Sequence, residues 1–205
     1  MANRCTRIPE IMFPREGVDL SKWAVIACDQ YTSQPDYWAE TDKTVGDAPS
    51  TLRLTLPEVY LEDADVAART EKIHQTLLQD VQDGTLRTLP AGVVLTERWS
   101  GGSCPRRGIV LSVDLEAYEY TPGSASLIRP TEKTVVERIP PRLKVRQGAC
   151  LELPHIMILI DDPDRQIIEP LFEQTASYDK LYDTDLMQNG GHITGWFLPN
   201  GPETG

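Results

Sequence analysis

The amino-acid sequence indicates an α+β fold: a mixed, mostly antiparallel sheet with two or more helices packed on it. Several segments have the apolar spacing of an amphipathic helix, and others have the apolar runs or the polar–apolar alternation of strands. These segments follow one another too irregularly for a doubly wound parallel sheet, in which strands and helices alternate. We therefore expect residues 1–198 to form a single α+β domain and residues 199–205 to form a flexible tail.

Length and composition are those of a globular protein. The chain has 205 residues, of which 40% are hydrophobic and 25% are charged, and it is long enough to bury roughly 70% of its unfolded surface. Its formal net charge of -11 argues against broad binding to nucleic acid or to an anionic membrane, because both need a positive surface. No apolar run approaches the ~20 residues of a membrane span. Residues 1–5 lack the apolar region of a secretory signal, so a cytoplasmic location is expected.

The four cysteines do not indicate a disulfide framework or a metal site. They are widely separated, no pair has the spacing of a zinc site, and a chain of this size does not depend on disulfides for stability. We expect reduced thiols at all four positions, which are Cys5, Cys28, Cys104 and Cys150.

The first predicted strand is the apolar run over residues 23–28, whose length suits a buried strand. A polar stretch that begins with Asp29 follows it, and Pro35 suits the first turn of a helix that ends near Val45, before Gly46. In open parallel sheets, ligands bind beyond the carboxyl ends of strands, so Asp29 is a candidate catalytic base. A plain polar connection between strand and helix is the favoured interpretation.

Two further elements are predicted in the next third of the chain. Residues 51–56 alternate polar and apolar side chains, as in a half-buried strand. The longest helix is expected to open among the acidic residues 62–65, which suit the positive end of the helix dipole, and to stop at Gly84. His74 lies in this helix and is expected to be half-buried or on the surface rather than a ligand. The apolar positions have the spacing of one buried face and are Val66, Ile73, Leu77 and Val81.

A β-hairpin is predicted from residues 92–99 and 106–114, two strand-like runs whose connecting loop is longer than a two-residue turn. The loop is rich in glycine and is followed by Arg106 and Arg107, which together with backbone N–H groups are able to bind an anion. A plain hairpin turn is the favoured interpretation. The sequence contains neither the phosphate-binding loop of nucleoside triphosphatases nor the glycine fingerprint of dinucleotide-binding folds.

The centre of the chain contains the main candidate site, a dense polar cluster before an apolar run. Residues 131–139 are predicted to form a short helix that Pro140 and Pro141 terminate. Folding of this segment would surround Glu132, a candidate acid–base residue, with hydroxyl and guanidinium groups that can hold a phosphate or a carboxylate. These groups belong to Arg129, Thr131, Thr134, Arg138 and Arg142. A corner in which Arg138 or Arg142 forms a salt bridge with Glu132 or Glu137 fits the same pattern, and both interpretations remain open.

The last third of the chain is expected to contribute two strands. Residues 156–160 form a continuous apolar run that indicates a central strand, and residues 193–198 indicate a final strand. Asp161 and Asp162 follow the first of these, and acidic side chains at the end of a strand are able to bind magnesium. Alternatively, Asp162 or Asp164 caps a helix predicted over residues 166–174, and the cap is favoured. His192 follows two glycines and either faces a ligand or, as is more common, belongs to a turn.

Several of these segments, taken together, resemble a known family. They include Glu-Arg-Ile-Pro-Pro-Arg at residues 137–142 and Asp-Leu-Met-Gln-Asn-Gly-Gly-His at residues 185–192. The other matching segments are residues 19–33, 46–50, 126–129, 131–132, 153–157 and 160–163. They are long and unusual, they cover nearly the whole chain, and they resemble the uncharacterised domain of unknown function 1015 family in its bacterial form.

The resemblance implies that this chain is one half of a longer architecture. Members of the family are roughly double-length proteins whose second half opens with an Asp-Gly-(Asn/His)-His signature. No such signature occurs in this sequence, so the resemblance implies an amino-terminal half, with a carboxyl-terminal half as its partner. The later signature is distantly similar to the phosphate motif of ParB/sulfiredoxin-like proteins, which include nucleotide-dependent serine kinases.

Two hypotheses for function follow. The first is an enzyme, or half of one, that binds a nucleotide or a phosphorylated small metabolite and transfers a phosphoryl group, with ATP or ADP and magnesium as implied cofactors. Glu132 and Asp29 would act as acid–base groups, and the arginines would hold a small anionic metabolite. The second is a non-catalytic scaffold or regulatory half that docks a partner domain or a second copy. It predicts an exposed apolar patch larger than a few hundred Å².

Overall fold

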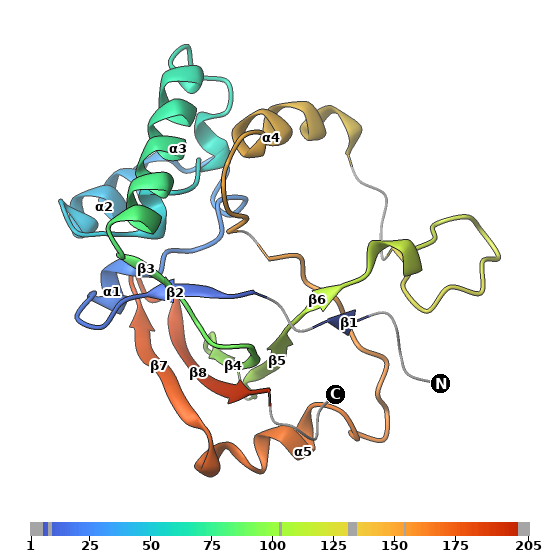
Figure 1. Ribbon diagram of the computed structural model, residues 1–205. Helices are drawn as coiled ribbons and strands as arrows, with labels where there is room; N and C mark the ends of the chain where they lie inside the picture. Colours follow the sequence, from blue (N-terminus) through green and yellow to red (C-terminus); the bar gives the residue numbers. More distant parts are fainter. Residues whose placement is uncertain (1–5, 8–9, 103, 131–134, 154, 201–205) are drawn as a thin grey trace.

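The computed structural model describes residues 6–7, 10–102, 104–130, 135–153 and 155–200, and it confirms the α+β fold (Figure 1). The strands are β1 (Thr6–Arg7), β2 (Met12–Pro14), β3 (Leu86–Thr88), β4 (Gly92–Trp99), β5 (Arg106–Val110), β6 (Ser112–Val113), β7 (Asp179–Leu186) and β8 (Gly191–Pro199). The main sheet has four antiparallel strands in the order β5–β4–β8–β7. Two smaller antiparallel sheets pair β1 with β6 and β2 with β3.

The helices lie around this sheet. The α-helices are α1 (Leu20–Trp23), α2 (Pro35–Val45), α3 (Val66–Gln82), α4 (Ile139–Arg146) and α5 (Glu169–Phe172). The 3-10 helices are η1 (Thr51–Arg53), η2 (Glu58–Tyr60), η3 (Leu115–Ala117), η4 (Val136–Arg138) and η5 (Thr175–Ser177). Figure 1 shows α2, α3 and α4 on the side of the molecule away from α5. Within the described part of the chain, none of these helices combines the length and the apolar character needed to cross a bilayer.

The strand β8 is the centre of the main sheet. It pairs with β4 from Gly92 opposite Pro199 to Trp99 opposite His192, and with β7 on its other side. Gly195 lies opposite Tyr182, and a β-carbon at position 195 would fall 2.1 Å from the Tyr182 ring. The absence of a side chain therefore lets the ring lie across the neighbouring strand.

Two groups of buried side chains hold the elements together. The first joins helices to β3 and contains Trp23, Leu54, Leu77 and Leu86. The second lies on one face of the main sheet and contains Leu89, Val94 and Phe197, with Phe13 of β2 packed against it. A fully buried leucine or phenylalanine contributes roughly 1.5–3 kcal/mol, so these groups are the main source of stability for the surrounding elements.

The sequence predicted the two longer helices and the hairpin correctly. The helix α2 begins at Pro35 and ends at Val45, where Gly46 has a φ of 58°. The helix α3 buries Ile73 and Leu77, and it is followed by Gly84, whose φ of 78° favours glycine. The strands β4 and β5 pair as an antiparallel hairpin. The final predicted strand is confirmed as part of β8. The neighbouring strand β7 was not predicted.

The predicted strand over residues 23–28 is wrong. Asp19 accepts a hydrogen bond of 3.0 Å from the backbone N–H of Ser21 and so caps α1, which ends at Trp23. The carbonyl of Trp23 accepts hydrogen bonds from the hydroxyls of Ser50 and Thr51, at 3.3 and 2.9 Å. These hydroxyls satisfy a backbone group that would otherwise have needed a neighbouring strand.

The predicted strand over residues 51–56 is wrong for a related reason. The Ser50 hydroxyl accepts a hydrogen bond of 3.2 Å from the backbone N–H of Leu52 and caps η1. A serine or threonine that bonds to nearby backbone favours turns and caps over strands. The alternating leucines Leu54 and Leu56 are nevertheless buried, so the pattern identified burial correctly but not the backbone conformation.

The prolines Pro140 and Pro141 do not end a helix as predicted; they lie in the first turn of α4. Residues in the first turn have no intrahelical partner for their N–H groups, so proline is tolerated there. Of the helix predicted over residues 131–139, positions 131–134 lie outside the described residues, and the described part includes η4.

The apolar run over residues 156–160 is not a central strand. These residues have no regular secondary structure, and their exposed fractions include 82% for Ile156 and 73% for Leu159. A continuous apolar run fits a buried strand or a buried helix only when a neighbouring element covers it. Among the described residues, this run has no such cover.

Candidate functional site

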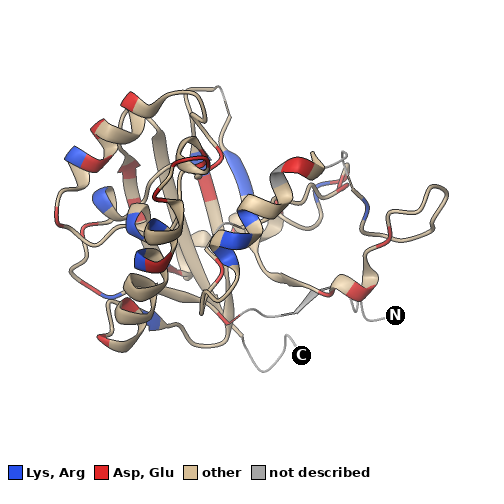
Figure 2. Cartoon of the chain, turned by 90° about the horizontal axis from the view of Figure 1, so that it is seen from above, with Lys and Arg blue, Asp and Glu red and all other residues tan. Residues whose placement is uncertain are grey.

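The candidate site is a cavity of about 590 Å³ that lies among α3, α4, the β4–β5 hairpin and the segments 26–30 and 149–157. Figure 2 shows basic positions on α4 and on the strands near the middle of the molecule. Among the described lining residues, the cationic ones are Arg98, Arg106, Arg142 and Arg146, and the acidic ones are Asp29, Glu58 and Glu152. Four guanidinium groups therefore meet three carboxylates around one space.

Arg98 and Arg106 form a like-charged pair across the two strands of the hairpin. Their α-carbons are register partners in β4 and β5, and both side chains line the cavity. Like charges directly opposite each other on one face of a sheet repel and are destabilising. Neither arginine forms an ion pair with a described residue. Two neighbouring guanidinium groups with this arrangement can bind an anion between them.

The turn between β7 and β8 holds Arg98 in place. The Nη2 atom of Arg98 donates a hydrogen bond of 3.2 Å to the carbonyl of Gly190, while its buried Nε atom has no hydrogen-bond partner among the described residues. A β-carbon at Gly191 would fall 1.9 Å from the carbonyl oxygen of Trp99, so the turn can approach β4 only because this residue is glycine. The cavity thus contains a guanidinium that is positioned but not fully bonded.

The same turn is attached to α2 by Gln188. Its Nε2 atom donates hydrogen bonds to the carbonyl of Tyr37 at 3.2 Å and to the hydroxyl of Thr41 at 2.5 Å. Thr41 is fully buried, and Gln188 has a φ of 54°, which is uncommon for a residue other than glycine. The segment 185–192 is therefore a positioning element that joins α2 to Arg98.

The other two arginines of the cavity are paired with carboxylates. Arg142 Nε lies 2.5 Å from Glu58 Oε1, and Arg146 Nη1 lies 3.4 Å from Glu152 Oε1. The buried Arg142 Nε atom has no hydrogen-bond partner among the described residues, so the contact is an ion pair. The contact with Glu58 raises the pKa of Arg142 above its usual value. These pairs leave Arg98 and Arg106 as the cavity cations without a carboxylate partner among the described residues.

Asp29 and Cys28 lie at the same cavity. Asp29 is exposed, lines the cavity, and is near enough to Arg142 to contribute to its raised pKa. Cys28 is a half-buried thiol whose pKa is raised, mainly by burial and further by the neighbouring carboxylates Asp29 and Glu58. A raised pKa keeps the thiol protonated and weakly nucleophilic. Asp29 is the acidic residue of the cavity that has no ion-pair partner among the described residues.

The opposite face of the hairpin carries a pair of oppositely charged side chains that form an ion pair. Arg107 Nε donates a hydrogen bond of 2.8 Å to Glu97, and these two residues are register partners next to Arg98 and Arg106. The guanidinium of Arg107 also lies over the ring of Phe172, 4.8 Å from its centre. Because side chains alternate between the faces of a strand, Arg107 points away from the cavity.

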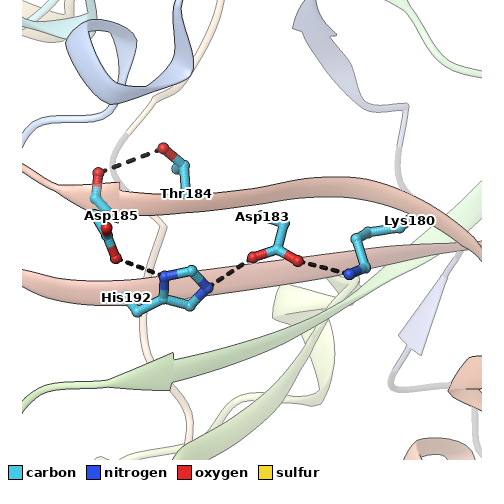
Figure 3. Close-up of polar contacts among 5 residues, drawn as sticks. All are labelled: Lys180, Asp183, Thr184, Asp185 and His192. Carbon is cyan, nitrogen blue, oxygen red and sulfur yellow. Dashed lines mark hydrogen bonds and ion pairs between the residues drawn. The ribbon is translucent and has the colours of Figure 1, made fainter.

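His192 belongs to a separate surface cluster (Figure 3). Its Nδ1 and Nε2 atoms lie 2.7 Å from Asp185 and 2.7 Å from Asp183, and Lys180 contacts Asp183 at 2.6 Å. The hydrogen bonds with Asp185 and Asp183 raise the pKa of His192. His192 is opposite Trp99, one residue from Arg98, so it lies on the face opposite the cavity. It is a strand residue within an ion-pair cluster.

The structure brings some of the predicted site residues together. Asp29, Arg106 and Arg142 line one cavity, whereas Arg107 and His192 lie on the other face of the sheet. Arg129 is exposed and donates a hydrogen bond of 2.9 Å to the carbonyl of Ser126, away from the cavity lining. Thr131, Glu132 and Thr134 lie outside the described residues, and only the backbone of Arg138 is described, in η4.

The acidic pair after the apolar run supports a turn. Asp162 accepts hydrogen bonds from the backbone N–H groups of Gln166 and Ile167, at 3.0 and 2.8 Å. It therefore caps this turn, and the helix predicted over residues 166–174 is reduced to α5. Among the described residues, no group of three or more histidine, cysteine or acidic side chains is placed to hold a metal ion. Magnesium binding by Asp161 and Asp162 stays a prediction.

Three functional candidates were not predicted from the sequence: Arg98, Glu58 and Arg146. Part of the signal for Arg98 was present, because residues 92–99 and 106–114 predict a hairpin that contains Arg98. The register that places Arg98 opposite Arg106 is not evident from the sequence. No comparable signal existed for Glu58 and Arg146, whose partners are distant in the sequence or separated by a turn.

Comparison with known proteins identifies a family but no function. The model of a family described as Protein of unknown function (DUF1015) matches residues 12–203. No curated protein and no solved structure matches the chain. The chemistry of the cavity is therefore the main guide to function.

Proposed function

We propose that this chain, which belongs to the DUF1015 family of proteins of unknown function, binds a small phosphorylated molecule in the cavity beside the β4–β5 hairpin. The observation that carries the proposal is the like-charged pair Arg98 and Arg106, which faces the cavity and has no carboxylate partner among the described residues. A phosphate placed between the two guanidinium groups would remove their repulsion and accept charge-assisted hydrogen bonds. A nucleotide or a phosphorylated metabolite supplies this group.

Phosphoryl transfer is the reaction that we propose for the site. A hydroxyl oxygen of an acceptor would attack the phosphorus atom, and its proton would pass to Asp29. The bond between phosphorus and the bridging oxygen would break, and the departing oxygen would keep the electron pair. The charge on the transferring group would be stabilised by Arg98 and Arg106, since positioned cations act mainly on charge that develops in the transition state. Glu132 remains a second candidate acid–base group.

A serine kinase-like reaction would use ATP or ADP with magnesium. Magnesium at such sites is held by phosphate oxygens, water and one or two carboxylates rather than by a complete protein cage. Asp29 is the cavity carboxylate without an ion-pair partner among the described residues. It would therefore be the described carboxylate free to contact a metal ion bound to the nucleotide, and in that arrangement Glu132, the second candidate acid–base group, would accept the proton.

The proposal is tested by titrating the chain with inorganic phosphate, phosphoserine, ADP and ATP, each with and without magnesium, and measuring thermal unfolding. A ligand present at 100 times its dissociation constant should raise the free energy of unfolding by about 2.7 kcal/mol. Arg106→Ala should remove the stabilisation, whereas Arg107→Ala should retain it, because only Arg106 faces the cavity. If no compound stabilises the chain, or if both variants behave alike, the proposal is wrong.

A second candidate function, docking of a partner domain or a second copy, is favoured by the exposed apolar run at residues 156–160. Its exposed residues include Ile156, Met157 and Leu159, and an uncovered apolar patch of this kind marks many interaction surfaces. Light scattering of the chain as a function of concentration tests self-association. A mass that stays at one chain, and that does not change in Leu159→Ser, would argue against docking of a second copy through this run.

A further inference from the structure

The walls of the cavity narrow the class of ligand beyond its phosphate group, on the premise that the proposed function is correct. We infer that the ligand carries an aliphatic body, so that it resembles an alkyl or acyl phosphate more than a nucleotide. About half of the described lining residues are apolar, and most of these are aliphatic: they include Leu54, Leu56, Leu61, Ile73, Leu77 and Val145. The remaining lining residues are charged or polar, and His155 is among them. Aliphatic walls with a few convergent polar groups are typical of sites for amphipathic small molecules.

The aliphatic wall is part of the protein core. Leu54 and Leu77 belong to the first buried group, and Ala149, Leu151 and Leu153 pack against it as well as lining the cavity. The arginines come from different elements, namely the β4–β5 hairpin and α4. The cavity therefore combines cationic side chains from these elements with an apolar wall that the core fixes in place.

A nucleobase has no aromatic side chain to stack on among the described lining residues. None of the described lining residues is phenylalanine, tyrosine or tryptophan, and proteins commonly bind bases by stacking them on such rings. A compact anion such as inorganic phosphate would contact the arginines but not the aliphatic part of the wall. A ligand with an alkyl chain satisfies both parts, because each buried methylene group adds hydrophobic stabilisation.

The inference is tested by isothermal titration of the unmodified chain with inorganic phosphate and with butyl, hexyl and octyl phosphate, all below their micelle concentrations. Affinity should rise about fourfold for each methylene group that enters the cavity. Butanoate, hexanoate and octanoate form a second series with a carboxylate head. A similar rise in affinity in both series shows that the cavity accepts either a phosphate or a carboxylate head group. A rise confined to the phosphates shows that the head group must be phosphate. Either result supports the aliphatic body.

Two leucines provide a matched test of location. Leu61 lines the cavity, while Leu78 is 47% exposed on α3 and is not among the described lining residues. Leu61→Ala should weaken octyl phosphate more than butyl phosphate, and Leu78→Ala should leave both unchanged. Octyl phosphate should also slow the alkylation of Cys28, which lines the cavity, without slowing that of the exposed Cys104.

The outcomes separate this inference from the proposed function. If inorganic phosphate, phosphoserine or ATP binds in an Arg106-dependent manner and chain length adds nothing, the aliphatic body is wrong but the proposed function stands. If no phosphate compound of either kind binds, both are wrong. Leu159 belongs to the exposed apolar run and is not among the described lining residues. Chain-length dependence that survives Leu61→Ala but is lost in Leu159→Ser would place the alkyl chain outside the cavity and would also overturn the inference.

Discussion

The β4–β5 hairpin carries two cross-strand pairs one position apart, and they differ in the charges that they bring together. Glu97 and Arg107 attract each other on one face, at 2.8 Å, while Arg98 and Arg106 face the cavity with the same charge. Cross-strand pairs contribute roughly 0.2–1 kcal/mol, favourable for opposite charges and unfavourable for like charges. The hairpin would be more stable with a carboxylate at either cavity position, so its present residues suit binding better than folding.

The largest expected effect is on anion binding. In the double variant Arg98→Ala, Arg106→Ala, we expect phosphate affinity to fall by about 3 kcal/mol or more, because each hydrogen bond to a charged group contributes roughly 1.5–3 kcal/mol. Arg107→Ala should change the affinity by less than about twofold, since Arg107 contacts Glu97 and Phe172 instead. Isothermal titration measures both. An equal loss in the two variants would show that the faces of the hairpin do not differ in function.

The next effect is on the turn that positions Arg98. Gly191→Ala would place a β-carbon 1.9 Å from the carbonyl oxygen of Trp99, and we expect a loss of about 1–3 kcal/mol of stability together with weaker phosphate binding. Gly101→Ala is the matched control: it has a similar φ of 85° but nothing within 4 Å of its β-carbon.

The control shares the backbone strain of an L residue at positive φ, about 1–2 kcal/mol, but not the clash. It should therefore lose less stability than Gly191→Ala and should bind phosphate normally. Chemical denaturation measures the stabilities. Equal behaviour of the two alanine variants would mean that the contact between the turn and β4 does not determine the position of Arg98.

A charge reversal sharpens the contrast in stability. Arg106→Glu converts the like-charged pair into an attractive one and should raise the free energy of unfolding by up to ~1 kcal/mol while removing phosphate binding. Arg107→Glu places two glutamates opposite each other, with Glu97 as the partner, and should lower the stability by a similar amount. Denaturant unfolding of both variants checks the signs. A loss of stability in Arg106→Glu would contradict the repulsion that we assign to Arg98 and Arg106.

The smallest effect is the pH dependence of the face opposite the cavity. Hydrogen bonds with Asp185 and Asp183 raise the pKa of His192 in the folded chain. The resulting stabilisation is fully present below about pH 6.5, the ordinary pKa of histidine, and is lost as the pH rises through the raised value. Because His192 is partly exposed, we expect only a few tenths of a kcal/mol.

Melting temperatures of the wild-type chain and of His192→Asn, measured from pH 5.5 to 9, test this expectation: the variant should lack the pH-dependent part. Phosphate affinity should be the same in both chains. A loss of affinity in His192→Asn would show that the two faces are coupled.

The sequence was informative where a pattern is local. Periodic apolar residues predicted α3, and the strand-like runs around the glycine-rich loop predicted the hairpin that carries Arg106. The strand predicted over residues 23–28 failed because Ser50 and Thr51, distant in the sequence, satisfy the carbonyl of Trp23. No local sequence pattern indicates such a distant hydrogen-bond partner.

The candidate site shows the same contrast between local patterns, which the sequence reveals, and contacts between distant residues, which it does not. Asp29, Arg106 and Arg142 were selected from separate polar clusters, and the structure brings them to one cavity. Arg98 was missed because the hairpin register, which places it opposite Arg106, depends on how residues 100–105 close the loop. The pairing of Arg142 with Glu58 depends on tertiary contacts between distant segments.

The two ends of one short turn reach different parts of the molecule. Gln188 is bonded to Tyr37 and Thr41 on α2, and two residues later the Gly190 carbonyl is bonded to Arg98. A displacement of α2 would therefore be transmitted to this guanidinium through very few covalent bonds. We expect any protein or ligand that shifts α2 to alter the affinity of the cavity for phosphate without entering the cavity. The outer surface of that helix would then be an allosteric site.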